Sequence, residues 1–146
     1  MKTNFTFAEA AKIFAQVDKV IAAVKEQEVI YAEYSEIDLA FDDEFEKYNY
    51  SFFRAPQELH EMFGKKMAMY DKKRAAERKT YRAIKDFAAL VGIEKDYSNF
   101  DSTFDFYEEV IKVYLNQKYY WQATDIVEKV KSIALSASRK ISFNAQ

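Results

Sequence analysis

Hydrophobic positions near the start of the chain follow a helical period. Thr6 and Glu9 have the spacing of a capping box, in which each side chain accepts a hydrogen bond from the other residue's backbone N–H at a helix start. Apolar residues then recur on one face at a mean period near 3.6. These are Phe7, Ala10, Phe14, Val17, Ile21 and Val24. The pattern predicts a helix from Thr6 to about Glu28.

Residues 29–53 fit two templates. Ile37, Leu39 and Phe41 alternate like a strand, as do Tyr48, Tyr50 and Phe52, but the acidic turn between them has no glycine for a tight hairpin. The helical template fits more positions, namely Ile30, Tyr34, Ile37, Phe41, Phe45, Tyr48 and Phe52. We therefore favour a helix. Because this stripe falls roughly opposite the preceding one, we expect a bend near residues 27–29.

Pro56 marks the next boundary, since proline suits the first turn of a helix and disfavours helical geometry at the residue before it. The following apolar stripe runs through Leu59, Phe63, Tyr70, Tyr81, Ile84, Ala88 and Val91. Gly92 is a plausible C-terminal cap, and Gly64 is a site for a kink. Lys73 and Glu77 fall on the stripe itself, so we expect the middle of this helix to project into solvent or to meet a partner.

Two shorter stripes follow. Ser102 is a good N-cap for a helix over residues 104–115, and a rotated stripe from Ala123 to Ala134 predicts a last helix. The fold predicted for residues 1–146 is therefore one all-α domain, a compact bundle of about five helices that includes one long basic helix. An α+β fold with a β-hairpin at residues 29–53 is the alternative.

Composition agrees with helices and narrows the chemistry. The 146 residues include two glycines, one proline and no cysteine, which leaves few tight turns, no disulfide and no thiolate. His60 is the single histidine, and its surroundings lack the spacing of a zinc or di-iron motif, so we interpret it as a surface residue. Phosphate-binding loops, dinucleotide motifs and EF-hands are missing. We expect no enzyme activity, no cofactor and no metal.

Neither a signal peptide nor an apolar run long enough for a bilayer is visible, which predicts a cytoplasmic protein without membrane contact. The formal net charge is only −2, but the charge is segregated. Residues 65–85 carry nine basic and two acidic residues, a net of +7. As a helix this stretch is about 30 Å long, with seven of its basic residues on one face. Candidate contacts to nucleic acid or an acidic partner are Lys72, Arg74, Arg78, Lys79, Arg82 and Lys85.

The acidic counterpart is residues 26–46, with nine carboxylates and no Lys or Arg. Carboxylates interleaved with tyrosines resemble a phosphate backbone in charge, and could occupy a basic groove of a partner. The candidate protein-binding residues are Glu33, Glu36, Asp38, Asp42, Asp43, Glu44 and Glu46. The acidic segment need not face a partner protein at all: its pairing with the basic stretch, within the fold or across a homodimer, is an equally open alternative.

Three adjacent bulky residues, Tyr119, Tyr120 and Trp121, cannot all be buried on one face of a helix and are candidate aromatic anchors. Together these features predict a non-enzymatic protein-binding module that occludes a partner's surface. The small size and the Tyr/Phe/Lys/Glu-rich composition favour a narrower interpretation, a phage or mobile-element inhibitor of a nucleic-acid-processing host enzyme such as a CRISPR nuclease. The alternative is a nucleic-acid-binding protein that uses the basic helix 65–85.

Overall fold

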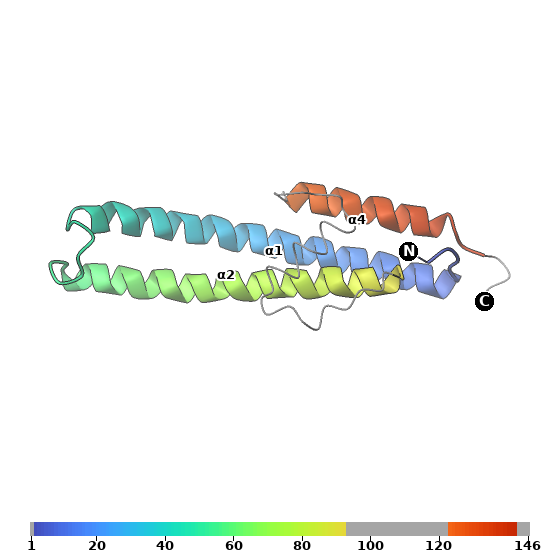
Figure 1. Cartoon of the computed structure of the whole chain (residues 1–146), viewed down its shortest axis with the longest axis horizontal. Helices are drawn as coiled ribbons and strands as arrows, with labels where there is room; N and C mark the ends of the chain where they lie inside the picture. Colours follow the sequence, from blue (N-terminus) through green and yellow to red (C-terminus); the bar gives the residue numbers. More distant parts are fainter. Residues whose placement is uncertain (1, 93–122, 143–146) are drawn as a thin grey trace. The chain divides into compact units, whose positions relative to one another are not determined.

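The computed structural model describes residues 2–92 and 123–142, and these residues are largely helical (Figure 1). The helices are α1 (Phe7–Glu46), α2 (Gln57–Leu90) and α4 (Ala123–Ser138). Within the described ranges the strand-like pairing is an isolated parallel bridge between Phe5 and Ile141. The all-α prediction is confirmed there, and the alternative hairpin at residues 29–53 is wrong. The helix predicted over residues 104–115, and with it the count of five, lies outside the described residues.

The chain divides into two compact units that are each traversed by α1 and α2. The hairpin unit is residues 26–76, in which the end of α1 and the start of α2 run antiparallel and are joined by residues 47–56 (Figure 1). The terminal unit combines residues 1–25 with 77–146 and contains the start of α1, the end of α2, and α4.

Helix boundaries follow the capping signals in the sequence. Thr6 Oγ1 accepts the backbone N–H of Glu9 at 3.1 Å, and Glu9 Oε2 accepts the N–H of Thr6 at 3.0 Å, so the predicted capping box is confirmed. Helix α2 begins directly after Pro56, and it continues through Gly64 to Leu90. Gly92 then adopts a left-handed conformation with φ of 78°, as a helix C-terminus requires.

Buried and half-buried side chains recur at alternating spacings of three and four along both long helices. Along α1 they are Ala10, Ile13, Val17, Val20, Val24, Gln27, Tyr31, Tyr34, Asp38, Phe41 and Phe45. Along α2 they are Leu59, Met62, Lys66, Met69, Lys73, Ala76, Thr80, Ala83, Phe87 and Leu90. This is the heptad spacing of coiled coils.

The heptad spacing explains why α1 has no break. A strict seven-residue repeat drifts by only about 20° per heptad around a straight helix. The buried face therefore moves gradually along α1, and the helix end predicted at about Glu28 is wrong because α1 continues without interruption to Glu46. Ile13 and Val20 occupy the core where the sequence pattern pointed to Phe7 and Phe14, which are exposed.

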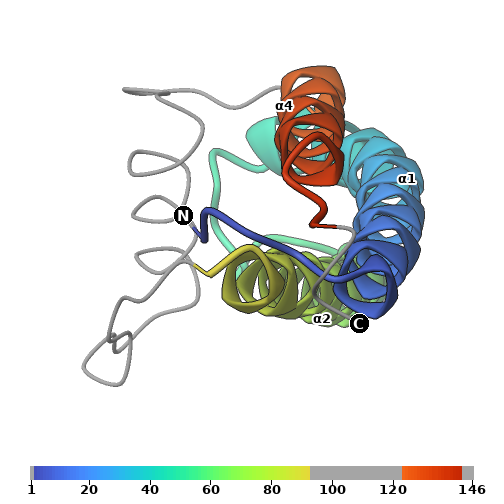
Figure 2. The ribbon, with the colours of Figure 1, turned by 90° about the vertical axis from the view of Figure 1, so that its right-hand side faces the viewer.

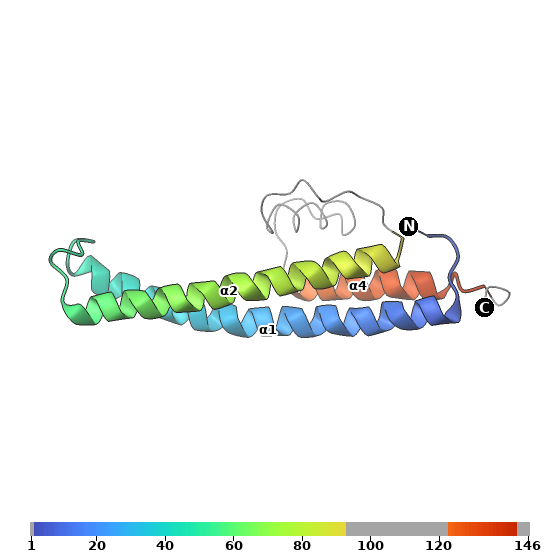
Figure 3. The same ribbon diagram turned by 90° about the horizontal axis from the view of Figure 1, so that it is seen from below.

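The hydrophobic core lies in the terminal unit. It joins residues of all three helices with Phe5 from the segment before α1, and it includes Ile13, Val20, Phe87 and Val130. Helix α4 lies beside the N-terminal part of α1 (Figures 1 and 2). The chain segments before α1 and after α4 meet at one end of this unit (Figure 3), where Phe5 donates its N–H to Lys140 O at 3.1 Å.

Candidate protein-binding surface

An aromatic cluster closes the hairpin unit where α1 passes into the connecting loop. Phe41 is buried, and its ring centroid lies 5.1 Å from that of Phe45 and 5.6 Å from that of Phe63. Phe52 of the loop packs between the helices, 4.6 Å from Phe45 and 5.2 Å from Phe63. Aromatic pairs at these distances add about 0.5–1.5 kcal/mol each beyond the burial of area. The loop is therefore anchored by its own side chains.

The backbone of this loop contains two successive left-handed residues. Asn49 has φ of 53° and Tyr50 has φ of 56°. Asparagine tolerates this region, but a tyrosine there costs about 1–2 kcal/mol. The carbonyl oxygen of Phe45 accepts the N–H groups of both Tyr48 and Tyr50 at 3.1 Å, and the Tyr50 ring packs edge-on against Phe45 at 5.5 Å. These contacts hold an otherwise unfavourable backbone conformation in the loop.

His60 supports the loop from the first turn of α2. Its Nε2 lies 3.2 Å from the carbonyl oxygen of Phe52, and its ring centroid is 5.4 Å from the Phe52 ring. Because a carbonyl oxygen only accepts hydrogen bonds, this contact requires a proton on Nε2. His60 is exposed, as the sequence indicated, and its role in the structure is to fix the loop backbone.

Three aromatic side chains of the loop form an exposed surface, which we call the aromatic tip: Tyr50, Phe52 and Phe53. Phe53 is 104% exposed and Tyr50 is 61% exposed. Large apolar groups that stay in water next to an ordered core are typical of binding surfaces. The predicted helical stripe included Phe52 as a core residue and did not include Phe53. The available signal was four aromatic residues within six positions just before Pro56, more than one face can bury.

Carboxylates cover the side of α1 that faces away from the hairpin interior. At about 100° per residue, they centre opposite Tyr34 and Phe41. We define the acidic face as the exposed residues that have no ion pair within the described part of the chain: Glu33, Glu36, Asp42, Asp43 and Glu46. Two other residues of the predicted acidic set are paired instead. Glu44 contacts Lys47 at 2.7 Å, and Asp38 contacts Lys66 at 2.8 Å.

The Asp38–Lys66 ion pair links the acidic segment of α1 to the basic segment of α2. Lys66 is half-buried, and its Nζ also lies 4.8 Å from the centroid of Phe41. The hydrogen bond to Asp38 raises the pKa of Lys66 above 10.5, against the smaller opposing effect of burial. Internal pairing of the two charged segments is thus present at this position, while the acidic face remains in solvent.

Lys73 lies among three tyrosines, which we call the tyrosine cage. Its Nζ is 5.2 Å from the ring centroid of Tyr31, 5.0 Å from Tyr34 and 5.7 Å from Tyr70, within the range of cation–π attraction. The expectation that the middle of this helix projects into solvent is wrong at this residue, which is half-buried. It is also wrong at Glu77, which is buried in the terminal unit. The tyrosines compensate for a charge on the helix's buried side.

The predicted basic contact residues are all on α2, in both units. Lys72 and Arg74 belong to the hairpin unit, where Lys72 is exposed and Arg74 is half-buried. The other four belong to the terminal unit and are exposed: Arg78, Lys79, Arg82 and Lys85. The predicted anchors Tyr119, Tyr120 and Trp121 lie outside the described residues.

The described residues contain no cluster of three or more His, Cys, Asp or Glu side chains arranged to hold a metal ion. None of their helices combines the length and the apolar character that a membrane span needs.

The chain was also compared with known proteins. No protein-family model, curated protein or solved structure matches it significantly.

Proposed function

We propose that this chain is a non-enzymatic protein-binding module, and that its hairpin unit occludes a basic surface of a partner protein. The observation that carries the proposal is the acidic face, whose five exposed carboxylates form no ion pair with any described residue, on the same hairpin unit as the fully exposed Phe53. Complementary charge speeds association and selects the partner, and a desolvated aromatic side chain supplies affinity. The acidic face would attract and select the partner, and the exposed aromatic side chain would supply the buried contact.

The partner class that suits this surface is a nucleic-acid-processing enzyme. Such enzymes present grooves of Lys and Arg that bind phosphates, and the carboxylates of the acidic face lie along a helix at intervals of a few residues. A bound module would compete with nucleic acid for the groove. The narrower interpretation, a phage or mobile-element inhibitor of an enzyme such as a CRISPR nuclease, stays a prediction from size and composition.

The test is affinity capture from the native host with the full chain and a charge-reversed variant. Asp43→Lys with Glu46→Lys alters the acidic face without touching the aromatic cluster. We expect the full chain to retain a basic, nucleic-acid-binding protein, the variant to lose it, and DNA or RNA to compete with the interaction.

A matched control keeps the change in net charge the same. Asp18→Lys with Glu128→Lys alters exposed residues of the terminal unit, and it should retain the partner. If the acidic-face variant captures the partner as well as this control does, the assignment of the acidic face is refuted.

Nucleic-acid binding by α2 is the second candidate, because Arg78, Lys79, Arg82 and Lys85 are all exposed on one helix. Phosphate contacts would give binding to labelled DNA or RNA that falls steeply between two salt concentrations. Arg78→Glu with Arg82→Glu should abolish such binding. Tight, salt-dependent binding that this variant loses would favour the second candidate over the first.

A further inference from the structure

One side of the hairpin unit exposes large apolar side chains from both of its helices. Phe63, Met67 and Tyr70 follow one another on α2 at spacings of four and three residues, and each is between 36% and 41% exposed. Leu39 on α1 is 64% exposed. We call these four residues the apolar flank. The interval i, i+4, i+7 is the one at which a helix contacts another helix along a single face.

Leu39 and Met67 lie on the same side of the helix pair. Asp38 of α1 contacts Lys66 of α2 at 2.8 Å, which places these two residues at one level of the antiparallel hairpin. Leu39 and Met67 each follow a member of this ion pair, and on antiparallel helices the next residue turns toward the same side of the pair. The other two members of the apolar flank are within about 60° of Met67 around α2.

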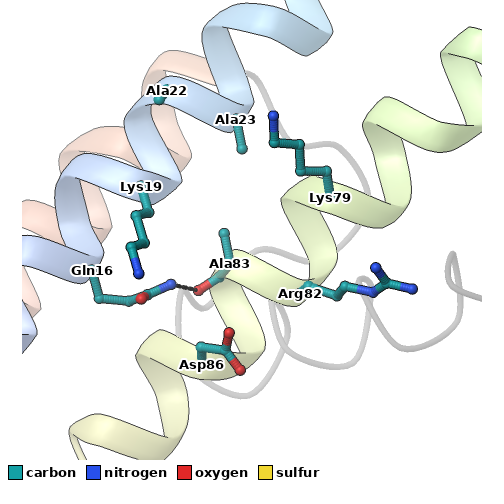
Figure 4. Close-up of a pocket in the computed structure, with 8 residues that line it drawn as sticks. All are labelled: Gln16, Lys19, Ala22, Ala23, Lys79, Arg82, Ala83 and Asp86. Carbon is teal, nitrogen blue, oxygen red and sulfur yellow. Dashed lines mark hydrogen bonds between the residues drawn. The ribbon is translucent and has the colours of Figure 1, made fainter.

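In the terminal unit the equivalent heptad positions of α2 are buried. Tyr81 and Ala88, which follow Met67 by two and three heptads, both belong to the core. There α1 and α2 are joined directly, with Gln16 Nε2 donating to Ala83 O at 2.9 Å (Figure 4), and α4 contributes a third helix to the core (Figure 2). The hairpin unit, residues 26–76, consists of the two long helices and their loop, so its apolar flank lacks such a third helix.

The α1 side of the apolar flank is bordered by carboxylates. Glu28, Ser35 and Asp42 are exposed and seven residues apart, so they line one side of α1, within about 60° of Leu39. Neither Glu28 nor Asp42 forms an ion pair with a described residue. An apolar strip beside carboxylates is complementary to a helix that has an apolar face next to Lys or Arg side chains.

We infer that the apolar flank binds an amphipathic basic helix of the partner protein, which completes a three-helix bundle in the hairpin unit. The apolar face of that helix covers Leu39 and Met67. Its Lys or Arg side chains lie opposite Glu28 and Asp42, which are about 21 Å apart along α1. The inference rests on the proposed function, because it specifies which element of the basic partner the hairpin unit holds.

The charge of the flank disfavours two other occupants. An anionic lipid surface would be repelled by Glu28 and Asp42. A second copy of the chain would bring a further nine carboxylates of residues 26–46 to the contact, and like charges oppose such an interface. We therefore expect the free chain to sediment as a monomer and to leave anionic vesicles unbound.

The experiment titrates the full chain, labelled at its methionine methyl groups, with a synthetic helix and follows it by NMR. The probe is a leucine–lysine peptide of about 18 residues, or five turns, with leucine at the i, i+3, i+4, i+7 interval. We expect a saturable shift at Met67, larger than those of the half-buried Met62 and Met69, and a dissociation constant of about 10–100 μM. A leucine–glutamate peptide of the same pattern should bind at least about tenfold more weakly. A leucine–lysine peptide of scrambled order, which has no apolar face, should leave Met67 unshifted.

Two neighbouring substitutions form a matched pair, measured with a fluorescent leucine–lysine peptide. Met67→Lys places a charge in the apolar flank and should weaken binding at least about tenfold. Ala68→Lys makes the same change in charge at an exposed position about 100° further around α2, and it should bind like the unmodified chain. Both positions are exposed, so the fold should persist, and thermal unfolding of each variant checks this.

Equal binding of the lysine and glutamate peptides, or equal binding by the two variants, would overturn the inference. A free chain that sediments as a dimer and becomes a monomer in Met67→Lys would assign the flank to a second copy, and vesicle binding lost in that variant would assign it to lipid. In capture from the host, a Met67→Lys chain that retains the partner overturns this inference alone. The acidic-face variant of Asp43 and Glu46 tests the proposed function separately.

Discussion

The ammonium Nζ of Lys66 lies 2.8 Å from Oδ1 of Asp38 and 4.8 Å from the ring centroid of Phe41. One lysine on the buried side of α2 is thus neutralised by a carboxylate and covered by an aromatic ring. Lys73, a second half-buried lysine of the hairpin unit, is likewise surrounded by the rings of the tyrosine cage.

The Asp38–Lys66 pair predicts a pH-dependent contribution to stability. Because the folded state raises the pKa of Lys66 above 10.5, the contribution is fully present below pH 10.5 and is lost as the pH rises through the raised pKa. Asp38→Asn should lower the free energy of unfolding by about 0.5–1 kcal/mol at neutral pH. The difference from the unmodified chain should shrink in urea unfolding above the raised pKa. Asp42→Asn, at an exposed position, is the control and should change little.

The tyrosine cage predicts that Lys73 and Lys72 respond differently to the same substitution. Lys73→Gln removes the cation from Tyr31, Tyr34 and Tyr70 and should cost about 1 kcal/mol of unfolding free energy. Lys72→Gln removes an exposed charge and should stay within about 0.5 kcal/mol. Chemical unfolding of both variants measures this, and equal stabilities would show that the cage contributes nothing.

The two glycines should respond to alanine in opposite directions. A Cβ at Gly92, where φ is 78°, would lie 2.7 Å from Lys2 Cβ and 2.9 Å from Lys2 N, so Gly92→Ala should destabilise by at least about 1–2 kcal/mol. Gly64 lies inside α2, and a Cβ there has no neighbour within 4 Å among the described residues. Gly64→Ala should stabilise by about 0.5–1 kcal/mol. Thermal unfolding checks both, and a destabilised Gly64→Ala would contradict the open surroundings.

At the aromatic tip we expect a substitution to reduce binding of the partner without reducing the stability of the fold. Phe53→Ser should leave the unfolding free energy within about 0.5 kcal/mol, because the side chain is fully exposed, and it should still reduce capture of the partner. Phe41→Ala removes the buried ring at the centre of the aromatic cluster and should cost about 3–5 kcal/mol. Retained capture by a folded Phe53→Ser variant would exclude this residue from the interface.

Local signals in the sequence were sufficient for the start of α1 and for both ends of α2. The capping box at Thr6 and Glu9, the break at Pro56 and the terminator at Gly92 act within a few residues of chain, so their physical effect can be inferred without knowing the fold. The stripe of Ile30, Tyr34, Ile37 and Phe41 likewise distinguished helix from hairpin, since each of these residues is buried or half-buried on α1.

The phase of the buried face was less predictable. Phe14 is larger than its neighbours, yet Ile13 and Val17 are in the core and Phe14 is exposed, because packing against the partner helix sets the period of the buried face at 3.5 residues. The same rule places Lys66 and Lys73 on buried positions, which hydrophobicity alone would never assign to a core.

The sequence by itself determined that the described chain is helical, where α1 begins, where α2 begins and ends, and that its charge is divided between an acidic and a basic segment, because these depend on residues close together in the chain. Only the tertiary structure decided which charges are neutralised and which stay in water. Asp38 forms an ion pair with Lys66, while Asp42 and Asp43 remain exposed. Those outcomes depend on the register in which α1 and α2 pack. Both helices together set that register, so neither segment of sequence determines it alone.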